Sequence, residues 1–191
     1  KLPPQAVETE RGLLGVLLTQ EHSFDEVCQQ LIPEVFYLKI HQYIYEAISE
    51  LSLAQKSIDS ITVAEQLKKN GKFEEVGGYE YLAELADIGT SAVSLGEYAD
   101  IIYDKFLARD LIRIASSIES QAFNDGTEIK NLMEYAEGQM FELNQRRVKK
   151  EVTKVKDVLN EVVDRIRAAK QNDGGFTGLR TSFDKLDEYT N

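Results

Sequence analysis

Apolar residues recur every three or four positions along almost all of this 191-residue chain, whereas strand-like alternation is nearly absent. A stripe with this period lies on one face of an α-helix and is buried by packing against other helices. The chain is therefore constrained to fold as packed helices. We predict an all-α protein in which a small helical bundle is followed by a long antiparallel helical hairpin and then by a linker helix.

Residues 1–92 are predicted to form the bundle, because turn signals divide them into five short helices. The apolar stripes of these helices are Leu14, Leu17 and Leu18; Phe24, Val27, Cys28 and Leu31; Ile40, Ile44, Ala47, Ile48 and Leu51; Val63, Ala64 and Leu67; and Tyr81, Leu82, Leu85 and Ala86. Ser23 with Glu26 is predicted to be a capping box, and Asn70-Gly71 to end the fourth helix. Cys28 is expected to be a small buried side chain.

Residues 93–147 are predicted to form the hairpin. A second capping box, Ser94 with Glu97, opens a helical run to about Ala122, and a turn at 124–126 leads into another run. Two such helices have too little partner surface within their own chain. We expect the hairpin to self-associate, and the alternative is that it folds back on the bundle. The residues predicted to carry self-association are Ile129, Leu132, Met133, Tyr135, Met140 and Phe141.

Residues 148–176 are predicted to be a linker that contains one amphipathic helix. An isolated helix of this length is marginal in water, so we expect it to dock in a groove of a neighbouring subunit. A helix lying on a membrane surface is the alternative. The apolar face of this docking helix consists of Val155, Val158, Leu159, Val162 and Ile166.

The net charge of −11 is unevenly distributed, because residues 1–144 are strongly acidic while residues 145–171 are basic. An acidic body argues against tight non-specific DNA binding, which needs clustered cations. The basic stretch is either a solvated helix face or a contact for nucleic acid or an acidic partner. Its candidate contact residues are Arg146, Arg147, Lys149, Lys150 and Lys154.

No catalytic, cofactor-binding or metal-binding residues are predicted. The sole Gly-Lys pair, Gly71-Lys72, is followed by Phe73, whereas a phosphate-binding loop needs Ser or Thr there. Two histidines and one cysteine are too few for a zinc site, and we expect His41 to be a hydrogen-bonded structural residue. The single cysteine, the short apolar runs and the lack of a leader-like segment lead us to expect a cytoplasmic protein with no membrane contact.

Several blocks of the sequence together resemble the amino-terminal region of bacterial DnaB-type replicative helicases. The blocks are Leu2-Pro3-Pro4-Gln5 with Glu8, Glu10 and Leu14-Gly15; Phe36-Tyr37 with His41, Ile44 and Ala47-Ile48; Thr62-Val63-Ala64 with Leu67-Lys68; residues 73–85; Tyr98-Ala99; and Gly178 to Asp187. The last block resembles the entry into the RecA-type ATPase core, although Ser182 stands where the family usually has glycine. Residues 177–191 are accordingly assigned to the start of that domain.

The resemblance implies the amino-terminal collar and linker of a hexameric ring. In the full-length protein it implies a 5′→3′ DNA-unwinding motor that uses ATP and magnesium and holds single-stranded DNA mainly through its ATPase domain. The fragment itself is expected to be non-catalytic and to assemble as a dimer, a trimer of dimers or a hexamer. Its other expected partners are primase and, in some bacteria, a helicase loader. The alternatives are direct DNA binding by the basic linker and an unrelated all-helical adaptor.

Overall fold

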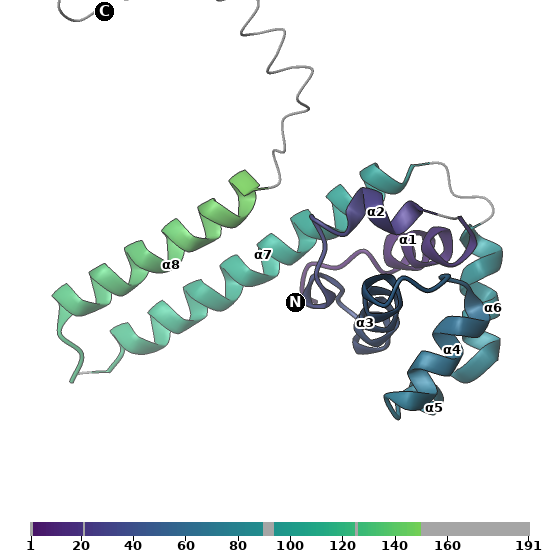
Figure 1. Ribbon diagram of the computed structural model, residues 1–191. Coiled ribbons are helices and arrows are strands. Elements are labelled where there is room, and N and C mark those ends of the chain that lie inside the picture. The colour runs from purple at the N-terminus through teal and green to yellow at the C-terminus, as the bar shows by residue number, and fades with distance from the viewer. Residues whose placement is uncertain (1, 21, 90–93, 125, 150–191) are drawn as a thin grey trace, which may run out of the picture. The chain divides into compact units, whose positions relative to one another are not determined.

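The computed structural model describes residues 2–20, 22–89, 94–124 and 126–149, and this part of the chain contains helices and no strand (Figure 1). The elements are α1 (Val7–Thr19), α2 (Ser23–Val27), the short 3₁₀ helix η1 (Pro33–Val35), α3 (Lys39–Leu53), α4 (Ser60–Lys69), α5 (Phe73–Val76), α6 (Gly78–Gly89), α7 (Leu95–Ala122) and α8 (Ile129–Lys149). The all-α prediction is thereby confirmed.

The chain divides into two units, residues 1–148 and 149–191. The docking helix and the 177–191 segment lie outside the described residues, and the four-part domain scheme stays a prediction.

Helix α1 is the centre of the bundle, and nearly every side chain along its second half is buried. Its closest neighbour is α6, where a glycine on each helix allows the two backbones to touch. A Cβ atom built on Gly15 would lie 2.1 Å from the carbonyl oxygen of Leu85 and 2.7 Å from the backbone nitrogen of Gly89. Only glycine fits at positions 15 and 89, because a methyl group at either position would overlap the backbone of the other helix in this close-packed interior.

Both predicted capping boxes are wrong. His22 is the N-cap of α2, and the Ser23 hydroxyl, already inside the first turn, donates to the Gln20 carbonyl oxygen at 2.7 Å. Ser94 is the N-cap of α7, as the pattern indicated, but its side chain makes no capping bond. The capping box among the described helices is at α4, where Asp59 accepts the Thr62 amide and the Thr62 hydroxyl accepts the Asp59 amide.

The prediction of a buried Cys28 is also wrong, because its side chain is exposed. Helix α2 ends at Val27, earlier than the apolar spacing suggested, and Cys28 is its C-cap residue. The chain then turns through 28–30, so Leu31 enters the core from a turn instead of from the helix stripe. The predicted stripe of Phe24, Val27, Cys28 and Leu31 has helical spacing, but only Phe24 and Val27 lie within helix α2.

Helix α7 belongs to two environments. Its first half packs on the bundle, with Ala99 and Ile102 in the core, and Arg109 ends that contact by donating to the carbonyl oxygens of Pro4 at 3.0 Å and Val35 at 2.6 Å. Burial lowers the pKa of Arg109. Beyond that point α7 runs beside α8 as an antiparallel pair that extends away from the bundle (Figure 1). Among the described helices, none is long and apolar enough to cross a bilayer.

Candidate protein interaction surface

Two buried polar side chains of the bundle, Glu10 and His41, form a hydrogen-bond network with Tyr81. The Nδ1 atom of His41 lies 2.6 Å from a carboxylate oxygen of Glu10, and its Nε2 lies 2.7 Å from the hydroxyl of Tyr81. Glu10 also accepts the backbone amide of Tyr37 at 2.7 Å, which fixes the chain just before α3 begins. His41 and Glu10 are fully buried and their hydrogen-bonding atoms face protein partners. His41 is therefore a hydrogen-bonded residue of the core, as predicted.

The hairpin has a polar edge along one side of the seam between α7 and α8. Arg146 of α8 pairs with Asp110 of α7 at 3.0 Å, and the hydroxyls of Ser117 and Tyr135 lie 3.2 Å apart. Asp110 and Ser117 are seven residues apart, so they lie on the same stripe of α7. These contacts hold the two helices in register and define which side of the pair is polar.

Apolar side chains lie on the other side of the same seam. On α8, Ile129, Met133 and Met140 are spaced by four and seven residues, which places them on one stripe. All three are exposed, with Met133 at 59% and Ile129 at 68% of full exposure. Rotation of about 100° per residue carries this stripe away from Tyr135 and Arg146, to the side opposite the polar edge.

Helix α7 contributes a matching stripe that the sequence analysis missed. Its members are Leu111, Ala115, Ile118 and Ala122, which are spaced by four, three and four residues. Leu111 is 44% exposed, and Ala115 and Ala122 are exposed as well. The same rotation places this stripe beside that of α8, because the two helices run in opposite directions. We name these residues, together with Ile129, Met133 and Met140, the hairpin apolar face.

The six residues predicted for self-association divide into three groups. Ile129, Met133 and Met140 lie on the hairpin apolar face. Leu132 is buried against α7, and Tyr135 bonds Ser117 across the seam, so both hold the hairpin together. Phe141 is 64% exposed but lies about 100° around the helix from Met140.

The predicted basic patch is represented by Arg146, whose side chain is engaged with Asp110 and exposed on its outer part. The side chains of Arg147, Lys149, Lys150 and Lys154 lie outside the described residues, as do those of Val155, Val158, Leu159, Val162 and Ile166. Within the part of the chain that the structure describes, no three or more His, Cys, Asp or Glu side chains form a group that could hold a metal ion.

A family model described as the DnaB-like helicase N terminal domain matches residues 2–104, more than half of the sequence. The chain belongs to this family. The replicative DNA helicase DnaB of Geobacillus stearothermophilus is 34% identical to the chain over 190 residues, and so is the replicative DNA helicase DnaC of Bacillus subtilis. The chain is covered completely in both comparisons but spans 42% of the length of each relative.

Solved structures agree with this assignment. The N-terminal domain of DnaB helicase from Mycobacterium tuberculosis superposes with a TM-score of 0.69 at 28% identity, and covers 74% of this chain and 99% of that one. A DnaB-like replicative helicase, described together with its interactions with primase, superposes with a TM-score of 0.63 over 96% of this chain and 39% of that one. At 24% identity the second likeness shows the fold alone.

Proposed function

We propose that the chain is the collar and linker region of a replicative DNA helicase. It holds neighbouring subunits of a hexameric ring together through the hairpin and binds primase, as well as a helicase loader where the organism has one. The full-length protein is an ATP- and magnesium-dependent motor that translocates 5′→3′ on single-stranded DNA in the cytoplasm. Full-length relatives named as replicative helicases support this proposal, since the chain aligns with them over its whole length.

The observation that carries the assembly role is the hairpin apolar face. Two helices side by side have one neighbour each, and here their polar contacts occupy one side of the seam. Exposed methionine, leucine and isoleucine side chains occupy the other side, next to alanines that allow a second helix pair to approach closely. A contiguous exposed apolar surface of this kind is typical of a protein–protein interface.

The assembly role is tested by light scattering on the 191-residue chain across a concentration series. We expect the mass of a dimer or of a higher multiple, and we expect Met133→Lys to shift the chain to a monomer with an unchanged melting temperature of the bundle. The matched control is Glu142→Lys, which reverses a charge on the polar side of the same helix and leaves the mass unchanged. A wild-type monomer at the highest concentration, or equal effects of both variants, would contradict the proposal.

The linker helix is proposed to couple adjacent subunits by docking Val155, Val158, Leu159, Val162 and Ile166 on the neighbouring ATPase domain. Val158→Asp in the full-length protein should reduce ATP-dependent unwinding while leaving the collar's mass unchanged.

The alternative, in which the basic linker binds DNA, is tested by titrating the 191-residue chain with single-stranded DNA at two salt concentrations. A steep salt dependence would support that alternative.

A further inference from the structure

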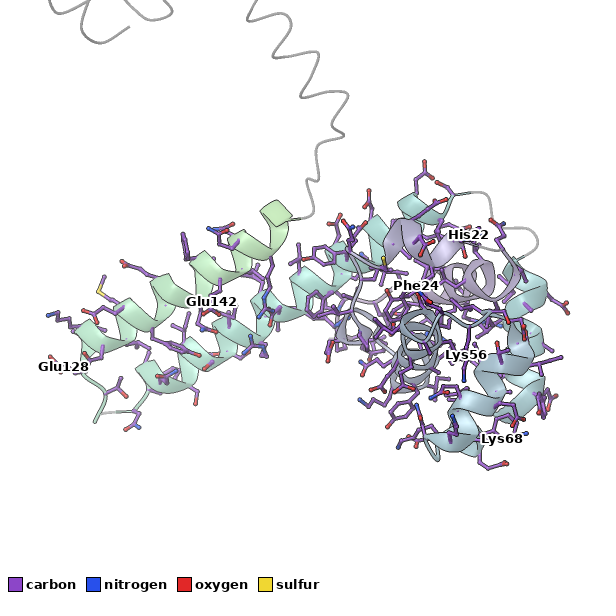
Figure 2. The ribbon with its side chains drawn as sticks, viewed as in Figure 1. His22, Phe24, Lys56, Lys68, Glu128 and Glu142 are labelled. Atoms are coloured by element: carbon purple, nitrogen blue, oxygen red, sulfur yellow. The ribbon has the colours of Figure 1, made fainter. Side chains whose placement is uncertain are left out.

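A cleft of about 700 Å³ opens at one end of the bundle between two loops. One wall consists of residues 17–20 at the end of α1 and 22–25 at the start of α2, and the other consists of Ser52 and residues 55–59 between α3 and α4. In the view of Figure 2, Phe24 lies between His22 on one wall and Lys56 on the other. The lining combines apolar and polar side chains, among them Leu18, Phe24, Gln20, His22, Gln55 and Lys56. The volume is within the range of about 300–1,000 Å³ that ligand-binding clefts occupy.

The α3–α4 wall contains a residue that its backbone disfavours. Helices α3 and α4 end in the same hydrogen-bond pattern, in which a backbone amide reaches back five residues: Lys56 to Leu51 at 3.0 Å, and Lys72 to Leu67 at 2.9 Å. The residue before each donor is left-handed, and it is Gly71 in α4 (φ 67°) but Gln55 in α3 (φ 54°). Glycine adopts this conformation without strain, whereas an L side chain does not. Stability alone therefore favours glycine at position 55.

The opposite wall repeats the feature. His22, the N-cap of α2, is left-handed with φ 63°. Within the described residues, His22 and Gln55 are the non-glycine residues with positive φ, and both line this cleft. Non-glycine residues with positive φ are uncommon, and strained backbone conformations of this kind occur most often at binding and active sites.

The polar side chains of the cleft suit a peptide group better than a charged small molecule. The hydrogen bonds among the described residues leave the carboxamides of Gln20 and Gln55 without a protein partner, and a carboxamide both donates and accepts as a peptide bond does. Charges of both signs line the cleft, since Lys56 lies among its lining residues together with Asp25 and Asp59. Leu18 and Phe24, which are largely buried, line the bottom of the cleft with apolar atoms, and we call them the cleft floor.

We infer that this cleft binds an extended peptide segment of a partner protein, with one apolar anchor side chain on the cleft floor and its backbone held by Gln20 and Gln55. This goes beyond the proposed assembly role, because the cleft is on the bundle and uses no residue of the hairpin. Gln55 is a binding residue kept at the expense of helix stability. Natural proteins hold such unfavourable residues at sites of function more often than elsewhere.

The test uses a random linear dodecapeptide phage library, selected on the 191-residue chain, and a synthetic peptide made from the selected sequence. We expect titration of the ¹⁵N-labelled chain with that peptide to shift amide resonances of residues 17–25 and 52–59. Gln55→Gly should weaken the peptide at least tenfold while raising the melting temperature by about 2–4 °C. Failure to select a peptide, shifts concentrated on other elements, or unchanged affinity for Gln55→Gly would each overturn the proposal.

The equivalent end of α4 provides the matched control. Gly71→Gln places glutamine in the same left-handed position away from the cleft, where nothing lies within 4 Å of a Cβ atom. It should lower the melting temperature and leave peptide affinity unchanged. If Gln55→Gly instead lowers the melting temperature, the strain argument fails and the proposal with it. Neither variant should alter the solution mass, so this outcome is separate from that of the hairpin experiment.

Discussion

The bundle and the hairpin are built from helices with the same apolar period, yet they differ in how many neighbours each helix has. In the bundle, the second half of α1 is covered almost completely, and Leu13 and Leu14 have no exposed surface. In the hairpin, each helix has one neighbour beyond Arg109, and Met133 keeps 59% of its surface exposed. Periodicity therefore predicts which face of a helix is apolar, while the number of neighbours decides whether that face is covered within the chain.

The polar contacts of the bundle are also more deeply buried than those of the hairpin. Glu10 and His41 of the bundle are buried, so removing either partner leaves an unsatisfied hydrogen-bonding group in the core, at a cost of about 1–3 kcal/mol. In the seam contact the Asp110 carboxylate is buried but the Arg146 side chain is 49% exposed, and an ion pair exposed to water contributes only about 0–1 kcal/mol. We therefore expect the bundle to be stable by itself and the hairpin to gain stability from the proposed second copy.

The largest effect is expected from Gly15→Ala, which tests how tightly the bundle is closed. The new methyl group would meet the Leu85 carbonyl and the backbone of Gly89, so α1 and α6 must separate. We expect a loss of about 3 kcal/mol or more in unfolding free energy, measured by urea denaturation. Gly96→Ala, in the first turn of α7 with nothing within 4 Å, is the control and should change stability by less than about 1 kcal/mol. Equal losses for both variants would show that the α1–α6 crossing is looser than described.

The second effect concerns the hairpin apolar face on its α7 side. Leu111→Lys puts a charge on this face and should weaken self-association by about 2 kcal/mol, or roughly thirtyfold in the dissociation constant. Sedimentation equilibrium measures the change. Ser120→Lys, on the polar side of α7, is the control and should leave the constant unaltered. If Met133→Lys abolishes association but Leu111→Lys has no effect, the interface is confined to α8.

Much of this fold follows from local sequence signals. The stripe from Ile40 to Leu51 predicts α3 correctly, and Asn70-Gly71 predicts the end of α4, because both depend on neighbouring residues alone. Cys28 shows the limit of these local signals, because the apolar spacing continues to Leu31, yet helix α2 ends at Val27 and Leu31 is buried after a turn. The Glu10–His41 contact had no local signal, because the two residues are 31 positions apart.

The candidate surface was predictable in part. Ile129, Met133 and Met140 were found from the sequence, but Leu132 and Tyr135 could not be separated from them without knowing which side of α8 faces α7. The spacing of Leu111, Ala115, Ile118 and Ala122 was present in the sequence and could have been used. This stripe is easy to overlook because two of its four members are alanines, which are only weakly apolar. Small residues nevertheless allow two helices to pack closely.

The third effect is a loss of bundle stability at alkaline pH. Burial raises the pKa of Tyr45 and, less strongly, that of Tyr81. A raised folded-state pKa gives stability that is complete below the unfolded value of about 10 and is lost as pH rises above it, by up to about 1.4 kcal/mol per pH unit for each group. Tyr45→Phe should make the fall between pH 10 and 12 shallower, with a uniform loss of about 1 kcal/mol below pH 9 from the missing bond to Leu31. Parallel curves for the two proteins above pH 10 would exclude this origin.

The smallest effect is expected from Gly138→Ala, which changes the hairpin without touching the bundle or the hairpin apolar face. Gly138 lies inside α8, with nothing within 4 Å of a Cβ atom. Alanine there should stabilise the helix by about 0.5–1 kcal/mol, since it restricts the unfolded chain more than glycine does. Amide exchange of α8 should slow accordingly, while the exchange of α1 and α6 stays the same, because a hairpin that depends on a partner opens separately from the bundle. If exchange slows equally in α1, the two regions unfold as one cooperative unit and the distinction between them is one of exposure alone.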